Sequence, residues 1–108
     1  MLHKRKVDDV QWVPQATLKI PVDFFRKRGI KFHEGNDDLD QFVGSDLLDA
    51  DGRMFILRSY RGYPKGTTTV YLPFELDSAS EIKSAIATIL RRFEVPKNAL
   101  SWQRYSIS

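Results

Sequence analysis

The residues best suited to chemistry in this sequence form a basic and aromatic segment near its middle. Within residues 58–66, cations alternate with tyrosines, namely Arg58, Tyr60, Arg61, Tyr63 and Lys65. Guanidinium and ammonium groups bind phosphates, and tyrosine rings stack on unpaired bases, so the segment is a candidate nucleic-acid contact. The same residues also suit a hairpin loop, in which glycine and proline shape the turn and the cations keep a sheet edge soluble.

Acidic side chains concentrate in the block that precedes this segment. Residues 34–52 contain seven acids and no Lys or Arg, whereas the stretches before and after each carry a net charge of +5. The acidic patch of interest consists of Asp37, Asp38, Asp40 and Asp46. Three explanations of this acidic block remain open: an acidic surface, charge complementarity within the fold, or turns in which Asp side chains hydrogen-bond to the backbone.

The stretch from His33 to Asp40 is the best candidate for an enzyme site. Carboxylates and one imidazole within eight residues could hold Mg²⁺ or Mn²⁺ and activate a water. No pair has a known ligand spacing, however, and a calcium loop around Asp51-Gly52 lacks acids at its first and last positions. The sequence has no Cys and no Gly-x-Ser-x-Gly motif. We therefore expect no catalytic residue, metal or cofactor, with a metal-dependent hydrolase as the minor alternative.

Asp51-Gly52 is the strongest local structural signal in the sequence. Asp-Gly between two apolar runs favours a two-residue hairpin turn, because both central residues need a positive φ. Such a turn predicts a register in which Ala50 faces Arg53 and Leu48 faces Phe55.

A second hairpin is expected to join residues 53–60 to residues 67–74. Alternation then divides the side chains between two faces. The core face would hold Phe55, Leu57, Val70 and Leu72, extended by Leu48 and Phe74. The opposite face would hold Met54, Ile56, Arg58, Tyr60 and Tyr71. This second face must be covered by another element or used for contact. The predicted binding face therefore comprises Met54, Arg58, Tyr60, Arg61, Tyr63, Lys65 and Tyr71.

Capping and periodicity predict the remaining elements. Ser78 and Glu81 form a capping box ahead of an apolar stripe with helical spacing, which predicts a helix over residues 78–93 that covers the sheet. A short strand is expected at residues 16–20 and a short helix at 22–28, entered at Pro21. The segment 38–43 is ambiguous. Its apolar residues have helical spacing, but a strand over residues 43–50 could equally begin there. The apolar tail would add an edge strand or fold back on the sheet.

Composition bounds the class of protein. The chain has 108 residues, 42% hydrophobic, and a net charge of +3, which is typical of one small folded domain. We expect residues 1–9 to be a flexible basic N-terminus and residues 10–108 to be a single α+β domain. Its fold would be an antiparallel meander of three or more strands packed against one long C-terminal helix, with a short N-terminal helix.

The expected function follows by elimination. No apolar run is long enough to span a bilayer, which predicts no membrane partner, and the lack of Cys favours the cytoplasm. Tyr, Met and Arg are residue types that anchor interfaces. The sequence therefore predicts a non-enzymatic binding module for a protein partner, of the inhibitor, immunity, antitoxin or regulatory type, or for a second copy in a homodimer. Nucleic-acid binding is the alternative.

Overall fold

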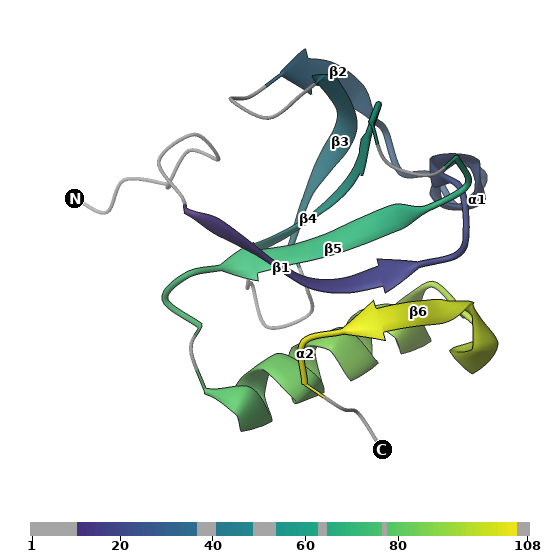
Figure 1. The fold of residues 1–108 in the computed structure, drawn as a ribbon. Helices are drawn as coiled ribbons and strands as arrows, with labels where there is room; N and C mark the ends of the chain where they lie inside the picture. Colours follow the sequence, from purple (N-terminus) through teal and green to yellow (C-terminus); the bar gives the residue numbers. More distant parts are fainter. Residues whose placement is uncertain (1–10, 37–40, 49–53, 63–64, 77, 106–108) are drawn as a thin grey trace.

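The protein folds as one antiparallel sheet with a helix on one face and a shorter helix at one end (Figure 1). The computed structural model describes residues 11–36, 41–48, 54–62, 65–76 and 78–105. The elements are β1 (Trp12–Leu18), α1 (Val22–Arg26), β2 (His33–Asn36), β3 (Gln41–Leu48), β4 (Met54–Tyr60), β5 (Thr68–Pro73), α2 (Ala79–Arg92), a 3₁₀ turn (Lys97–Ala99) and β6 (Leu100–Gln103). The strand order is β2-β3-β4-β5-β1-β6. The α+β class predicted from the sequence is confirmed, although α2 has only 14 residues.

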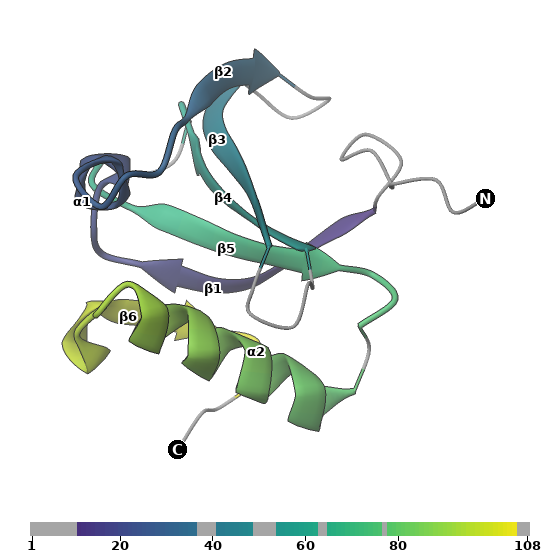
Figure 2. The same ribbon diagram turned by 180° about the vertical axis from the view of Figure 1, so that it is seen from behind.

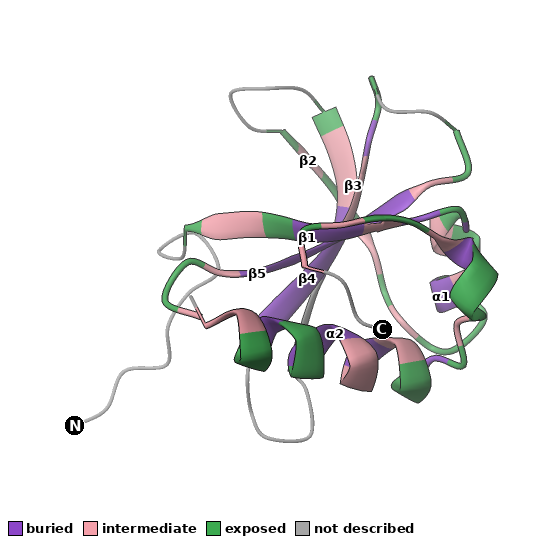
Figure 3. Ribbon diagram, turned by 60° about the horizontal axis from the view of Figure 1, so that its bottom comes forward, coloured by how far each residue is buried: buried purple, intermediate pink, exposed green. Residues whose placement is uncertain are grey.

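Helix α2 begins where the capping signal places it. The Ser78 side chain accepts a hydrogen bond from the Glu81 N–H at 3.4 Å, so Ser78 is the N-cap. Helix α2 lies along one face of the sheet (Figure 2), and the residues of its apolar stripe are buried against that face (Figure 3). Its buried residues Ile82, Ala85, Ile86 and Ile89 join one core with Phe55, Leu57, Val70 and Leu72. Among the described residues, no helix is long and apolar enough to cross a membrane.

The pairing of β4 with β5 confirms the predicted second hairpin. Ile56 lies opposite Tyr71, and Leu57 lies opposite Val70. Leu57 and Val70 therefore face α2, whereas Ile56 and Tyr71 face the other side of the sheet. The prediction that Phe74 extends the core face is wrong, because Phe74 follows the end of β5 and is 62% exposed.

The register of β3 against β4 differs by one residue from the prediction. Leu48 lies opposite Met54, not Phe55, and Leu47 takes the position opposite Phe55. Five residues separate Leu48 from Met54, whereas regular pairing around a two-residue turn requires an even number. Asp-Gly also occurs in longer hairpin loops, so the dipeptide does not fix the loop length. The predicted turn lies at residues 49–53, outside the described residues.

Strand β1 is longer than predicted and contains a proline. It starts at Trp12 and ends at Leu18, whereas the sequence predicted a strand at 16–20. Only the part from Ala16 to Leu18 pairs with β6, so among the described residues Pro14 has a strand neighbour on the β5 side alone. A residue without an N–H is tolerated there, next to the register shift that precedes Ala16. Strand β6 confirms the edge-strand alternative for the tail.

Helix α1 is shorter than the predicted 22–28. Pro21 is its N-cap rather than its first helical residue. The predicted stop at Gly29 is confirmed: Gly29 has φ of 90°, its N–H donates to the Arg26 carbonyl at 3.0 Å, and the Ile30 N–H donates to the Phe25 carbonyl at 3.1 Å. The buried Phe25 ring packs edge-on against Phe93, 5.3 Å away, and so ties α1 to the end of α2.

Two other predictions concern parts of the chain that the structure describes only incompletely. The N-terminus, predicted to be flexible over residues 1–9, lies outside the described residues. The ambiguous segment 38–43 is strand from Gln41 onward, where β3 begins. Strand β2, which pairs with β3 at the edge of the sheet, was not predicted.

Candidate functional site

The predicted binding face divides into two groups that lie in different environments. Arg58 and Tyr60 belong to β4, and Tyr71 lies opposite Ile56 on the sheet face away from α2. Arg61 and Lys65 follow β4 and line a pocket, to which Tyr60 also contributes. Met54 is half-buried at the other end of β4, opposite Leu48. The seventh predicted residue, Tyr63, lies outside the described residues.

Arg58 is held in a stack of aromatic side chains. Its guanidinium carbon lies 4.0 Å from the centre of the Phe42 ring and 5.8 Å from that of Tyr71. Its Nη1 also donates a hydrogen bond to the Tyr60 hydroxyl at 3.0 Å. Arg58 is thus attracted to the aromatic rings by cation–π interactions, and it also gives the Tyr60 hydroxyl a hydrogen-bond partner. Arg58 therefore stabilises this face of the sheet.

Two glycines make the room for that stack. A Cβ at Gly35 would lie 2.8 Å from Cζ of Phe42, and a Cβ at Gly44 would lie 3.0 Å from Cγ of Arg58. The Phe42 ring thus packs directly on the backbone of β2 and β3. With Phe42 and Trp12 packed against them, Tyr60 and Tyr71 expose only 4% and 6% of their surface. Direct contact of either ring with a partner stays a prediction, and their burial disfavours it.

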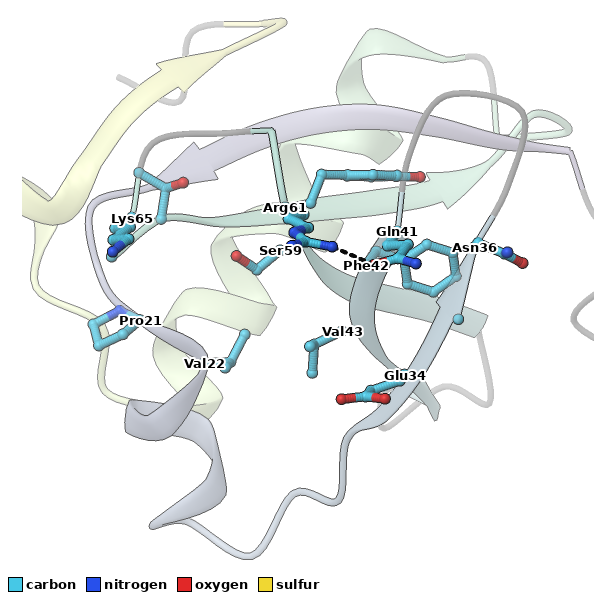
Figure 4. A pocket seen from close by; sticks show the side chains of 14 residues that line it. Pro21, Val22, Glu34, Asn36, Gln41, Phe42, Val43, Ser59, Arg61 and Lys65 are labelled. Carbon is cyan, nitrogen blue, oxygen red and sulfur yellow. Dashed lines mark hydrogen bonds between the residues drawn. The ribbon is translucent and has the colours of Figure 1, made fainter.

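A pocket of about 750 Å³ lies on the other side of this part of the sheet, beside α1 (Figure 4). Five segments contribute its lining, which consists of Pro21, Val22, Glu34, Gly35, Asn36, Gln41, Phe42, Val43, Ser59, Tyr60, Arg61, Lys65, Gly66 and Thr67. Its volume falls in the range of roughly 300–1,000 Å³ that small-molecule sites have. The pocket is therefore large enough to hold several side chains of a bound segment.

The apolar part of the pocket comes from the start of α1 and from β3. Pro21 has extended backbone angles, φ −75° and ψ 162°, and turns the chain from β1 into α1. Val22 and Val43 are half-buried and project toward the pocket from opposite sides (Figure 4). Glu34 lies opposite Val43 in the β2–β3 ladder. Side chains directly opposite each other in a ladder share a face, so Glu34 also belongs to the pocket wall.

Opposite charges line the rim of the pocket. The Arg61 side chain donates from Nη1 to Oε1 of Gln41 at 2.9 Å, and the Arg61 N–H donates to the Gln41 carbonyl, also at 2.9 Å. These two bonds fix Arg61 against the start of β3. Lys65 is exposed and, within the described residues, has no ion-pair partner. Glu34 lies across the pocket from these cations (Figure 4), so the described residues of the rim hold two positive charges and one negative charge.

The predicted acidic patch is described at only one of its four residues. Asp46 is in β3 opposite Ile56, whereas Asp37, Asp38 and Asp40 lie outside the described residues. His33 and Glu34 are exposed neighbours in β2. Within the part of the chain that the structure describes, no three His, Asp or Glu side chains come close enough to hold a metal ion.

Sequence reasoning missed the apolar half of the pocket. Residues 21, 43 and 67 are distant in sequence, and no spacing rule brings them together. The only local signal was Pro21, which was interpreted as a helix start. The basic residues Arg61 and Lys65 were found, because loop cations next to tyrosines are visible in the sequence itself.

Comparison of the chain with protein-family models, with curated proteins and with solved structures gives no significant match. The function must therefore be inferred from the geometry and chemistry of these side chains.

Proposed function

We propose that the protein is a non-enzymatic binding module whose pocket between α1 and β2–β3 receives a segment of a protein partner. The observation that carries this proposal is the 750 Å³ pocket itself, with apolar walls and a charged rim. Protein interfaces typically combine an apolar centre with a polar rim. The cytoplasm, favoured by the absence of Cys, is the location that we propose for this activity.

The composition of the pocket suits a protein segment better than a nucleic acid. Val22 and Val43 offer aliphatic surface to an apolar side chain. Glu34 would repel phosphates that approached Arg61 and Lys65. Of the tyrosines that could have stacked on bases, Tyr60 and Tyr71 are largely buried. A partner with one apolar and one charged side chain satisfies both parts of the pocket.

The test is to block the pocket and compare the partners captured. Val22→Arg places a long side chain at the pocket wall, whereas Ser84→Arg adds the same side chain on the exposed surface of α2. Each variant and the wild type serve as bait in extracts of the source cells, with quantitative mass spectrometry. We expect at least one protein to be retained by the wild type and by Ser84→Arg and lost with Val22→Arg.

The captured protein is then purified and titrated against the same three baits. A loss of affinity of at least tenfold for Val22→Arg alone supports the proposal. Identical affinity for all three baits contradicts it, provided that circular dichroism shows Val22→Arg to be folded. Sizing of the wild type at several concentrations identifies the case in which the partner is a second copy.

Nucleic-acid binding is a second candidate, because the charges are unevenly distributed. Residues 34–52 hold seven acids and no Lys or Arg, whereas the stretches before and after this block each carry a net charge of +5. Labelled single-stranded RNA and DNA, titrated at several salt concentrations, test this candidate. Affinity that falls with salt and with Arg61→Ala/Lys65→Ala, but not with Lys83→Ala/Arg91→Ala on α2, would favour it over the protein partner.

A further inference from the structure

We infer that the sheet carries a second binding surface, for single-stranded nucleic acid, where the exposed Trp102 ring lies between the cations Lys19 and Arg104. Strand β6, which holds Trp102, forms the edge of the sheet beside β1 (Figure 1). None of these three residues lines the pocket. Binding at this surface goes beyond the proposed function and does not depend on it.

The register of β6 against β1 decides which way Trp102 points. Trp102 lies opposite Thr17 in the ladder. The neighbours of Thr17, Ala16 and Leu18, are buried in the core under α2. Because side chains alternate along a strand and opposed residues share a face, Thr17 and Trp102 project from the face away from α2. The Thr17 hydroxyl lies 3.3 Å from the hydroxyl of Thr69. The indole ring therefore stands beside polar side chains, on the face that no described helix covers.

Exposure distinguishes Trp102 from the aromatic residues at the centre of this face. Trp102 is 46% exposed, whereas Tyr60 and Tyr71 are buried. Trp102 also lies at the border of the sheet, because no described strand pairs with the outer side of β6. A flat ring such as a nucleic-acid base can therefore reach the indole.

Two cations flank Trp102 along the strand direction. The Lys19 N–H donates to the Ala99 carbonyl at 2.6 Å. The Arg104 N–H donates to the Gln15 carbonyl at 2.9 Å, so the two strands stay paired past their ends and alternation places both cations on the face of Trp102. Each cation is two residues from Trp102 or from the residue opposite it, which is roughly 7 Å along the strand on either side. Both are exposed, and within the described residues neither forms an ion pair.

No acidic residue is close to these cations in the sequence. Residues 10–22 and 95–108, which contain β1 and β6, hold Lys19, Lys97 and Arg104 and no Asp or Glu. Residues 1–9 contain three Lys or Arg and two Asp, so they also carry a net positive charge. The segments that form this surface therefore favour an anionic partner.

The combination of an exposed indole with flanking cations favours single-stranded nucleic acid among anionic partners. Bases of a single strand are free to stack on an aromatic ring, and this stacking tolerates any base. Cations on both sides of the ring can bind phosphates of the same strand. In a duplex the bases already stack on each other, and an acidic protein segment would use the cations without needing the ring. Binding should therefore depend on Trp102 as well as on Lys19 and Arg104.

Fluorescence titration with decamers of dT and of rU tests the inference on the full chain. The chain has two tryptophans, so in Trp12→Phe the emission comes from Trp102 alone. We expect at least one decamer to quench this emission saturably, with an affinity that falls as salt is added. Anisotropy of the labelled decamer should show an at least fivefold loss of affinity for Trp102→Ala. Phe74→Ala removes another large exposed side chain and is the matched control, which should bind as the wild type does.

Charge variants test the contribution of the two cations. Lys19→Ala/Arg104→Ala should weaken binding of the decamer at least fivefold and flatten its salt dependence. Lys83→Ala/Arg91→Ala removes two exposed cations from α2 and should leave the affinity nearly unchanged. Trp102→Phe keeps a ring that can stack and should bind more tightly than Trp102→Ala, while circular dichroism checks that each variant is folded.

Several outcomes would overturn the inference. They are an absence of binding at low salt, and an equal loss of affinity with Trp102→Ala and Phe74→Ala. A loss with Arg61→Ala/Lys65→Ala in place of the variants of this surface would move the site to the pocket rim. Oligoglutamate that displaces the decamer at equal charge would identify an acidic protein segment as the partner instead. The proposed function is judged by the protein captured in the pocket experiment, so either can fail while the other stands.

Discussion

The two faces of the sheet are closed by different means. On one face the aliphatic stripe of α2 covers Phe55, Leu57, Val70 and Leu72, and the cluster extends to α1 through Phe25. On the other face no described helix is present. There Ile56, Tyr60 and Tyr71 are covered by Trp12 and Phe42, with Arg58 stacked on the Phe42 ring.

The difference shows that a sheet can bury a second face without a second layer of backbone. Large aromatic rings bury up to about 250 Å² each, so a few of them can cover several strands. They need space close to the backbone, which Gly35 and Gly44 provide. The α2 face depends on the packing of a whole helix, whereas the aromatic face depends on a few side-chain contacts. The faces should therefore respond differently to substitution.

The largest difference is expected from neighbouring residues of β4 that point to opposite faces. Leu57→Ala should lower the free energy of unfolding by about 4 kcal/mol, because side chains held on α2 cannot fill the space. Ile56→Ala should lower it by about 2 kcal/mol, since the surrounding rings at the sheet surface can collapse inward. Urea unfolding monitored by circular dichroism measures both. Equal losses would show that the aromatic cover is as rigid as the helix.

Arg58 on the aromatic face, compared with Arg61 on the pocket rim, provides a smaller test of the aromatic face. Arg58→Ala should lower the free energy of unfolding by about 1.5–2 kcal/mol, because it removes a cation–π contact and the hydrogen bond to Tyr60. Arg61→Ala, at an exposed position, should change it by less than about 0.5 kcal/mol. Thermal melts of the two variants give the comparison. If the two melting temperatures are the same, the stack does not stabilise this face.

The smallest expected effect concerns the end of α2, on the helix-covered face. Glu94 has φ of 55°, a region that costs a residue with a side chain about 1 kcal/mol, whereas the turn after α1 has a glycine, Gly29, in this region. Glu94→Gly should therefore raise the free energy of unfolding by about 0.5–1 kcal/mol, and Gly29→Ala should lower it by about 1 kcal/mol.

The double variant Glu94→Gly/Arg58→Ala tests whether the two faces are independent. The single effects should add to within about 0.5 kcal/mol, because the two residues share no contact. A larger deviation in urea unfolding would mean that the helix-covered and aromatic faces are coupled through the sheet.

The sequence predicted those elements whose signals are local. Helix α2 was predicted because Ser78 caps it and its apolar residues repeat at helical spacing. The β4–β5 register and the shared face of Arg58, Tyr60 and Tyr71 were predicted from strict alternation. The β3–β4 register was not, because Asp51-Gly52 does not specify how many residues a loop contains. Pro14 and the short, polar β2 gave no strand signal.

The sequence by itself determined the α+β class, the helix that covers the sheet and the presence of cations at Arg61 and Lys65, because capping, alternation and charge are properties of consecutive residues. Only the tertiary structure decided that β1 pairs with β5, which brings Val22 to the pocket, and that β2 pairs with β3. Pairing between distant strands depends on the packing of the whole chain. The pocket, and with it the function that we propose, arises from that pairing.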